Sequence, residues 1–221
     1  EIYTLSLHDA LPISIHFLAI VLLPAWVLDR FVYRLAGHQP GDLATIIFSS
    51  GSTGIPKGVM LTHSNLAANG ESIIQAIDPG PRDRLLGVLP FFHAFGLTGC
   101  LWVPLLSGIG AVYHANPLDA KTIGKLVAEH RATVLMSTPT FCQSYLRACE
   151  PVQFATVRHA LVGAERLPAS LAAAFQEKFG IALLEGYGCT EMGPVVAVNT
   201  VDVAHRSEEH TSELQSPIHI S

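Results

Sequence analysis

FSSGSTGIPKGV, at residues 48–59, joins two strand-like runs through a loop rich in Ser, Gly and Thr. Backbone N–H groups and hydroxyls in such a loop converge on phosphate oxygens, and Gly51 and Gly54 allow a close approach. Lys57 adds a positive charge suited to a polyphosphate. The order is not that of the Walker A loop, because Lys57 precedes Gly58. A flexible loop has a similar composition, but the flanking strands favour a phosphate-binding loop.

Strand-like and helical runs alternate on both sides of this loop. Aliphatic runs predict strands at residues 43–49, 58–61, 84–89, 111–114, 133–136 and 158–162. Helices are predicted at residues 65–77, 118–130, from Pro139 onward, and at 168–179. This alternation predicts an α/β fold with a mostly parallel, doubly wound sheet flanked by helices.

Local signals fix where these helices begin and end. Thr62 or Ser64 is suited to cap the first helix, and Gly180 is suited to end the last one. Pro139 favours the first turn of the third helix. In the second helix, one apolar face is predicted from Leu118, Ile123, Leu126 and Val127.

Two further segments carry candidate site residues. Residues 89–96 read LPFFHAFG, which alone is typical of an apolar turn with a core histidine. Residues 185–194 read EGYGCTEMGP, and Glu191 there has the oxygen ligands that Mg²⁺ prefers. Upstream, residues 162–167 read VGAERL. A lone Glu in a loop is usually solvated, so the case for a site depends on the segments together.

These segments, in this order, resemble the signature motifs of the acyl-adenylating, AMP-binding superfamily. The resemblance covers nearly all of residues 14–205 and implies part of the large N-terminal domain of such an enzyme, truncated. ATP and Mg²⁺ are the implied cofactors. The implied reaction joins a carboxylate to the α-phosphate of ATP, releasing pyrophosphate, and a thiol then displaces AMP.

The resemblance also implies roles for individual residues. Glu191, Thr190 and Lys57 are the implied catalytic residues, with Glu191 holding Mg²⁺. Phe92, His93 and Gly96 are implied to line the entrance for the acid substrate. The implied nucleotide-binding residues are Ser49, Ser50, Gly51, Ser52, Thr53, Gly54, Lys57, Gly163, Ala164, Glu165, Gly186, Tyr187, Gly188 and Thr190.

The second segment narrows the expected substrate. Amino-acid-activating members of the superfamily place an Asp just after the aromatic residue, whereas residues 91–96 contain no acid. A buried ammonium would lack its partner, so a fatty acid is favoured. Several stretches resemble most the synthetase part of bacterial acyl-acyl-carrier-protein synthetase / 2-acylglycerophosphoethanolamine acyltransferase. Acyl carrier protein or coenzyme A is therefore the implied acceptor.

Both ends of the chain resemble foreign sequence. Residues 1–13, EIYTLSLHDALPI, and 206–216, RSEEHTSELQS, are similar to translated sequencing adapters. Residues 1–13 and 206–221 are therefore interpreted as artefacts around a partial adenylation domain at 14–205. We expect the ribose-binding Asp, hinge and C-terminal Lys of the family to be missing. A non-catalytic nucleotide-binding fragment, or a truncated reading frame without a role of its own, stays open as an alternative.

Composition limits the partners and the compartment. The net charge of -5 comes from 18 acidic and 13 basic residues, and the ends hold five of the acids and one base. The remaining balance predicts no nucleic-acid partner. Four scattered cysteines fit a reduced, cytoplasmic protein. Residues 15–28 are apolar but too short to span a membrane and predict a buried helix or connector; a longer parent on the inner face of a membrane stays possible.

Overall fold

The computed structural model describes residues 21–32, 37–49, 56–199 and 218–219. The chain divides into two compact units, residues 1–42 and 43–221. In the first unit, α2 (Ala25–Val27) is followed by the π-helix η1 (Leu28–Val32). Pro24 interrupts the apolar run, and Leu22 and Trp26 are exposed. Of the two alternatives predicted for residues 15–28, a buried helix is therefore wrong for residues 21–27, whereas a connector is not contradicted. Residues 15–20 lie outside the description.

The second unit begins with a two-stranded antiparallel sheet. β1 (Leu43–Ser49) pairs with β2 (Lys57–Thr62). Both strands were predicted from the sequence, but their pairing was not. Because side chains alternate along a strand, Ile47 and Leu61 face a small core, whereas Phe48 and Met60 lie on the exposed face.

α3 (His63–Ile77) leaves the end of β2 directly. The hydroxyl of Thr62 accepts a hydrogen bond from the N–H of Asn65, and the Asn65 side chain accepts one from the N–H of Thr62. This reciprocal cap starts the helix two residues before the predicted position. Ile73 and Ile77 on its inner face are buried.

A seven-stranded sheet forms the rest of the unit, in the order β4-β3-β5-β6-β7-β8-β9. Pairing is parallel from β4 through β7, and β8 and β9 are antiparallel. The strands are β3 (Arg84–Gly87), β4 (Gly110–Tyr113), β5 (Val134–Ser137), β6 (His159–Val162), β7 (Leu183–Gly188), β8 (Val195–Val198) and β9 (Ile218–His219). β9 belongs to the segment that we interpret as foreign.

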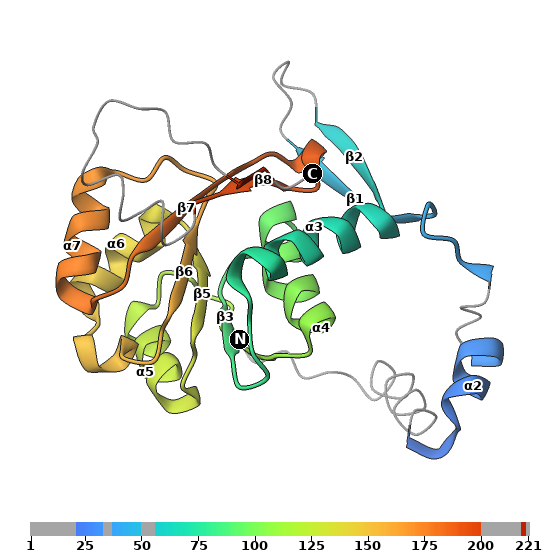
Figure 1. Cartoon of the computed structure of the whole chain (residues 1–221), viewed down its shortest axis with the longest axis horizontal. Helices are drawn as coiled ribbons and strands as arrows, with labels where there is room; N and C mark the ends of the chain where they lie inside the picture. The colour runs from blue at the N-terminus through green and yellow to red at the C-terminus, as the bar shows by residue number, and fades with distance from the viewer. Residues whose placement is uncertain (1–20, 33–36, 50–55, 200–217, 220–221) are drawn as a thin grey trace. The chain divides into compact units, whose positions relative to one another are not determined.

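Helices cover both faces of this sheet, which confirms the doubly wound α/β prediction. α5 (Ala120–His130), α6 (Pro139–Ala148) and α7 (Ala169–Phe179) lie on one face, and α3 and α4 (Val103–Ser107) lie on the other (Figure 1). Each face of the sheet has its own hydrophobic core, and neighbouring strand residues alternate between the two. Leu86 and Leu135 pack in the first core, with α5, α6 and α7, whereas Leu85 and Met136 pack in the second core, with α3 and α4.

Three local features differ from the sequence prediction. A π-helix, η3 (Gly96–Trp102), leads into α4, in an apolar stretch that has no polar face to mark a helix. Leu118 is exposed because α5 begins only at Ala120, where Asp119 accepts the N–H of Thr122. β7 continues to Gly188, so the start of EGYGCTE is a strand rather than a loop.

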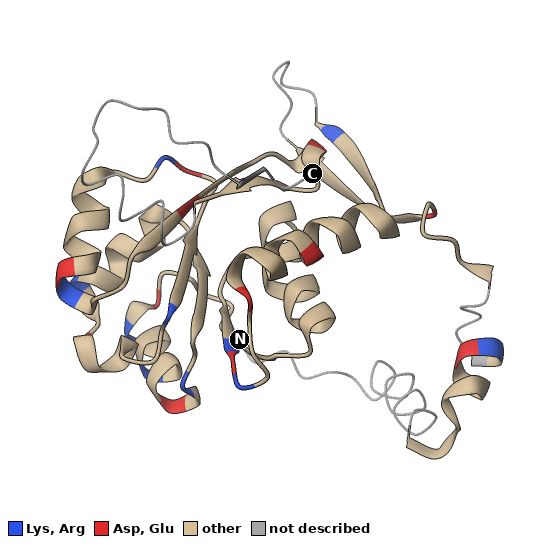
Figure 2. Ribbon diagram, in the orientation of Figure 1, with Lys and Arg blue, Asp and Glu red and all other residues tan. Residues whose placement is uncertain are grey.

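Charged residues of both signs are interspersed over the described elements (Figure 2). None of the helices within the described ranges is long and apolar enough to cross a bilayer.

Candidate active site

A cavity of about 390 Å³ opens at the carboxyl ends of the parallel strands. Its wall is built from residues 89–90 and 93–96 after β3, Thr138 after β5, residues 163–165 after β6, and residues 186–190 at the end of β7 and just after it. In open parallel sheets this edge is where ligands bind. Most of the remaining lining is apolar: Ile73, Phe141, Leu161, Val162, Val195 and Val198.

The aromatic segment contributes two of its three predicted residues to the cavity wall. His93 and Gly96 line the cavity, whereas Phe92 does not and is 73% exposed. The Phe92 ring instead contacts the ring of His93, with centroids 4.5 Å apart. Phe95, which the sequence reasoning missed, lies in the cavity wall. No local pattern marked it, because only its position at the start of η3 distinguishes Phe95 from the neighbouring phenylalanines.

Gly96 is required by backbone packing as well as by its place in the wall. A β-carbon at this position would lie 2.1 Å from the carbonyl oxygen of Pro90. At Gly163, a β-carbon would lie 3.3 Å from the Phe95 ring and 3.4 Å from the carbonyl oxygen of Gly186. The glycines therefore let three separate segments approach one another around the cavity.

The loop after β6, residues 163–165, is held by hydrogen bonds at its first and last residues. Gly163 donates its N–H to the carbonyl of Ser137 at 3.2 Å. Ala164 has a φ of 67°, an uncommon left-handed conformation for a residue with a β-carbon. The carboxylate of Glu165 accepts hydrogen bonds from the N–H and hydroxyl of Thr140, at 3.2 and 2.6 Å. Glu165 thus anchors the loop to the start of α6.

The end of β7 places four predicted residues in the cavity wall: Gly186, Tyr187, Gly188 and Thr190. The Tyr187 side chain is 71% exposed, so one of its ring faces is open to a ligand or solvent. Glu185 was not predicted as a functional residue. Its carboxylate accepts the N–H of Leu167 at 2.8 Å and ties β7 to the loop after β6.

Lys57 and Glu191 lie outside the cavity lining, on elements that adjoin each other. Lys57 begins β2, and Glu191 lies on the exposed 3-10 turn η5 (Thr190–Met192). β2 and η5 are neighbours in the fold. The hairpin therefore brings β2, which begins at Lys57, next to the turn that carries Thr190 and Glu191.

Ser49 pairs with Lys57 across the hairpin. Its hydroxyl is buried and has no hydrogen-bond partner among the described residues. A buried hydroxyl without a partner is costly, so an acceptor such as a phosphate oxygen fits this position. The predicted contacts Ser50, Gly51, Ser52, Thr53 and Gly54 lie outside the described residues.

The side chains of the site suit a Mg²⁺ ion only if the ion is shared between the protein and the phosphates of a nucleotide. Within the described ranges no group of three or more His, Cys, Asp or Glu side chains is placed to hold a metal ion. The exposed carboxylate of Glu191 suits an ion that takes one protein carboxylate and several phosphate oxygens. The exposed Cys189 thiol also lines the cavity, whereas Cys100, Cys142 and Cys149 are buried.

Fold and site define an α/β domain whose ligand cavity lies at the carboxyl edge of a parallel sheet. The chain belongs to the AMP-binding enzyme family, whose model matches residues 25–216. The expected boundaries at residues 14 and 205 stay a prediction.

Two of the named relatives are acid–coenzyme A ligases. The chain is 34% identical to feruloyl-CoA synthase of an Amycolatopsis species, over 76% of this chain and 34% of that protein. It is 30% identical to a long-chain-fatty-acid–CoA ligase of Bacillus subtilis, over 80% of this chain and 35% of that protein. The chain thus spans about a third of the length of these relatives.

Among solved structures, o-succinylbenzoate coenzyme A synthetase of Bacillus subtilis, in complex with ATP and magnesium ion, superposes with a TM-score of 0.71. It is 26% identical, and the match covers 81% of this chain and 36% of that one.

Proposed function

We propose that this chain forms the nucleotide- and acid-binding part of an AMP-forming acid–thiol ligase. The observation that carries the proposal is one cavity whose wall joins residues 89–90 and 93–96 with residues 163–165 and 186–190. These segments are distant in sequence, and the carboxyl ends of β3, β6 and β7 bring them together. Membership of the AMP-binding family and the coenzyme A ligases among the relatives support the same function.

Each segment has a distinct task in this proposal. The adenosine of ATP lies between residues 163–165 and the exposed face of Tyr187. Its phosphates extend toward Ser49, the loop at residues 50–54, Lys57 and Thr190. Mg²⁺, held by Glu191, neutralises phosphate charge when bound. The protein acts by orienting the carboxylate toward the α-phosphate and by offsetting charge, without a covalent step of its own.

An uncharged acyl chain is the proposed substrate, and a fatty acid is its class. The inner wall is apolar, and its acidic residue Glu165 is already committed to Thr140. A substrate ammonium would therefore lack a free carboxylate inside this wall. His93, which is exposed and lines the cavity, receives the substrate carboxylate in this proposal.

Coenzyme A is the acceptor that the relatives favour. Acyl carrier protein, which the resemblance to acyl-acyl-carrier-protein synthetases implies, is the second candidate acceptor. The Cys usage supports a cytoplasmic location for the protein. A nucleotide-binding module without turnover is the alternative, and it shares the cavity but not the acid substrate.

Titration calorimetry of ATP with the whole 221-residue chain tests the proposal. We expect binding in the presence of Mg²⁺, weakened about tenfold by Glu191→Gln, because the amide keeps the shape but removes the charge near Mg²⁺. Without Mg²⁺ the variant and the original chain should bind ATP equally. Glu129→Gln, an exposed change on α5, is the control.

The substrate class is tested in the longer protein by acid-dependent exchange between pyrophosphate and ATP. Fatty acids should support this exchange and amino acids should not. Exchange with amino acids alone would overturn the fatty-acid proposal. Absence of any ATP binding to the chain would overturn the function itself.

A further inference from the structure

The buried side chain of Asn69 connects α3 to the strand that follows the Thr190–Glu191 turn. Its Nδ2 donates to the carbonyl oxygen of Val195 at 2.7 Å, and its Oδ1 accepts the N–H of Val195 at 3.2 Å. Asn69 is only 7% exposed and lies 126 residues before Val195. The amide offers one donor and one acceptor to a single backbone residue, as a neighbouring strand would.

Val195 is the first residue of β8, at the base of the turn that carries Thr190 and Glu191. On the other side of that base, Cys189 donates its N–H to the carbonyl of Pro194 at 2.9 Å. β7 and β8 pair with an irregular register between Tyr187 and Gly188. The regular strand ladder is therefore interrupted where Asn69 supplies its two hydrogen bonds.

The turn also rests on α3 through close packing. A β-carbon built on Gly193, which has a φ of 91°, would lie 3.8 Å from the Asn69 β-carbon and 3.8 Å from the carbonyl oxygen of Asn65. The same helix continues directly from β2, whose first residue is Lys57. One helix thus holds both the strand that carries Lys57 and the turn that carries Glu191.

We propose that Asn69 is a positioning residue that sets the Thr190–Glu191 turn relative to Lys57, so that both act on one magnesium-bound polyphosphate. This inference rests on the proposed function. Asn69 does not line the cavity, and it acts through the backbone of Val195. Hydrophobic residues such as Ile73 and Ile77 hold α3 in the core independently of the amide.

Asn69→Ala in the 221-residue chain tests the inference with two readouts, which are nucleotide affinity, measured for ATP and for AMP, and amide hydrogen exchange. Affinity for ATP with Mg²⁺ should fall about tenfold, because loss of one well-made hydrogen-bond pair misplaces the turn. Affinity for AMP without Mg²⁺ should change less than about twofold, because adenosine contacts residues 163–165 and 186–188 instead. Amide hydrogen exchange at Val195 and in residues 190–193 should quicken about tenfold.

Ser72→Ala is the matched control on the same helix. Its hydroxyl donates only to the carbonyl of Ala68, one turn earlier, so both readouts should stay unchanged. If Asn69→Ala does not fold, Asn69→Asp replaces it: the carboxylate keeps an acceptor for the Val195 N–H but loses the donor.

The two readouts separate the inference from the proposed function. Faster amide exchange at the turn in Asn69→Ala would support the role of Asn69 in holding the turn. If the original chain also bound no ATP, the proposed nucleotide site would be wrong. Unchanged exchange and unchanged affinity in Asn69→Ala would overturn the inference. An equal loss of AMP affinity would also overturn it, because the amide would then support the whole cavity rather than the turn.

Discussion

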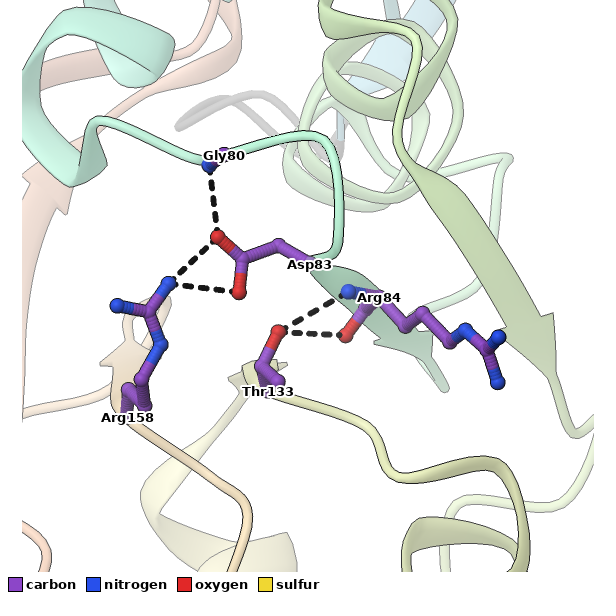
Figure 3. Close-up of polar contacts among 5 residues, drawn as sticks. All are labelled: Gly80, Asp83, Arg84, Thr133 and Arg158. Atoms are coloured by element: carbon purple, nitrogen blue, oxygen red, sulfur yellow. Dashed lines mark hydrogen bonds and ion pairs between the residues drawn. The ribbon is translucent and has the colours of Figure 1, made fainter.

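Arg158 places one guanidinium nitrogen, Nη2, against both carboxylate oxygens of Asp83, at 2.7 Å from Oδ1 (Figure 3). Asp83 is 4% exposed, and the Gly80 N–H donates to its other oxygen at 2.7 Å. Beside them, Thr133 Oγ1 accepts the N–H of Arg84 at 3.0 Å. This network joins the starts of β3, β5 and β6 at the edge of the sheet opposite the cavity.

Asp83→Asn should lower the free energy of unfolding at pH 7 by about 1 kcal/mol, a modest value because solvent screens the partly exposed Arg158. Burial raises the pKa of the Asp83 carboxyl, but hydrogen bonds from Thr133 and Arg158 outweigh it and hold the pKa below its ordinary value of 3.8. The ionised form is therefore favoured by folding. Its contribution is present above pH 3.8 and is lost as the pH falls through the lower, folded-state pKa.

Urea unfolding at pH 7 and at about pH 3 measures the difference in unfolding free energy between Asp83→Asn and the original chain. This difference should shrink at the lower pH. Asp78→Asn is the control. Asp78 is an exposed C-cap with a φ of 43°, a left-handed conformation that Asn tolerates well. An equal loss in both variants would contradict the role assigned to the Asp83–Arg158 pair.

Gly96→Ala should destabilise the fold by about 2–4 kcal/mol, because the new methyl group meets the Pro90 carbonyl and the backbone must move. Thermal unfolding of the whole chain measures the change. Gly110→Ala is the matched control at the start of β4. Its β-carbon would lie 3.4 Å from the Arg84 side chain, an ordinary contact, so the melting temperature should stay within about 3 °C.

Phe95→Ala should cost about 3 kcal/mol of stability, whereas Phe92→Ala should cost less than about 1 kcal/mol. Phe95 is partly buried against the second core, and Phe92 is 73% exposed. Chemical unfolding of both variants separates them. The same loss in both would show that the cavity wall is differently arranged.

How well each element of the fold could be predicted from the sequence depended on the kind of signal it carries. Aliphatic runs bounded by loops predicted β1 to β6 to within two residues at each end, whereas β8 was not predicted. Thr62, Pro139 and Gly180 marked helix ends because caps are local. η3 and α4 escaped prediction because GLTGCLWVPLLSG has no polar face from which a helical period can be seen. Leu118 was wrongly placed on the face of α5, since the Asp119 cap starts the helix at Ala120, two residues later than predicted.

For the site, the sequence motif alone could not show which of its phenylalanine rings lines the cavity. Phe91, Phe92 and Phe95 look alike in sequence, and only the turn before η3 points Phe95 into the wall. The contacts of Asn69 with Val195 and of Glu185 with Leu167 span long sequence distances, so no local pattern could reveal them.

Cys189 should be the thiol that reacts fastest with a disulfide reagent in the native chain. It is exposed, whereas burial raises the pKa of Cys100 and Cys142 to about 12 and that of Cys149 to about 11. A thiol with such a pKa holds almost no reactive thiolate near pH 8. One thiol per chain should therefore react quickly, and all four after unfolding.

Because Cys189 lines the cavity beside Thr190, ATP with Mg²⁺ should slow its reaction at least several-fold. Cys189→Ser identifies the reacting thiol, since rapid labelling should vanish in that variant. Labelling that ATP leaves unchanged, despite measured ATP binding, would place the nucleotide away from Thr190.

The 221-residue chain should form no measurable acyl-AMP, even with ATP, Mg²⁺ and a fatty acid at saturation. Orientation of the reacting groups and exclusion of water supply much of the catalysis in such a reaction. Here Tyr187 is 71% exposed and Glu191 also faces solvent, so the phosphate end of the cavity is open. The chain also spans about a third of its relatives' length. Trapping with hydroxylamine detects acyl-AMP as acyl-hydroxamate, and Glu191→Ala gives the background. Product above that background would show that the described cavity suffices to orient and shield the reaction, and that its exposed rim does not limit it.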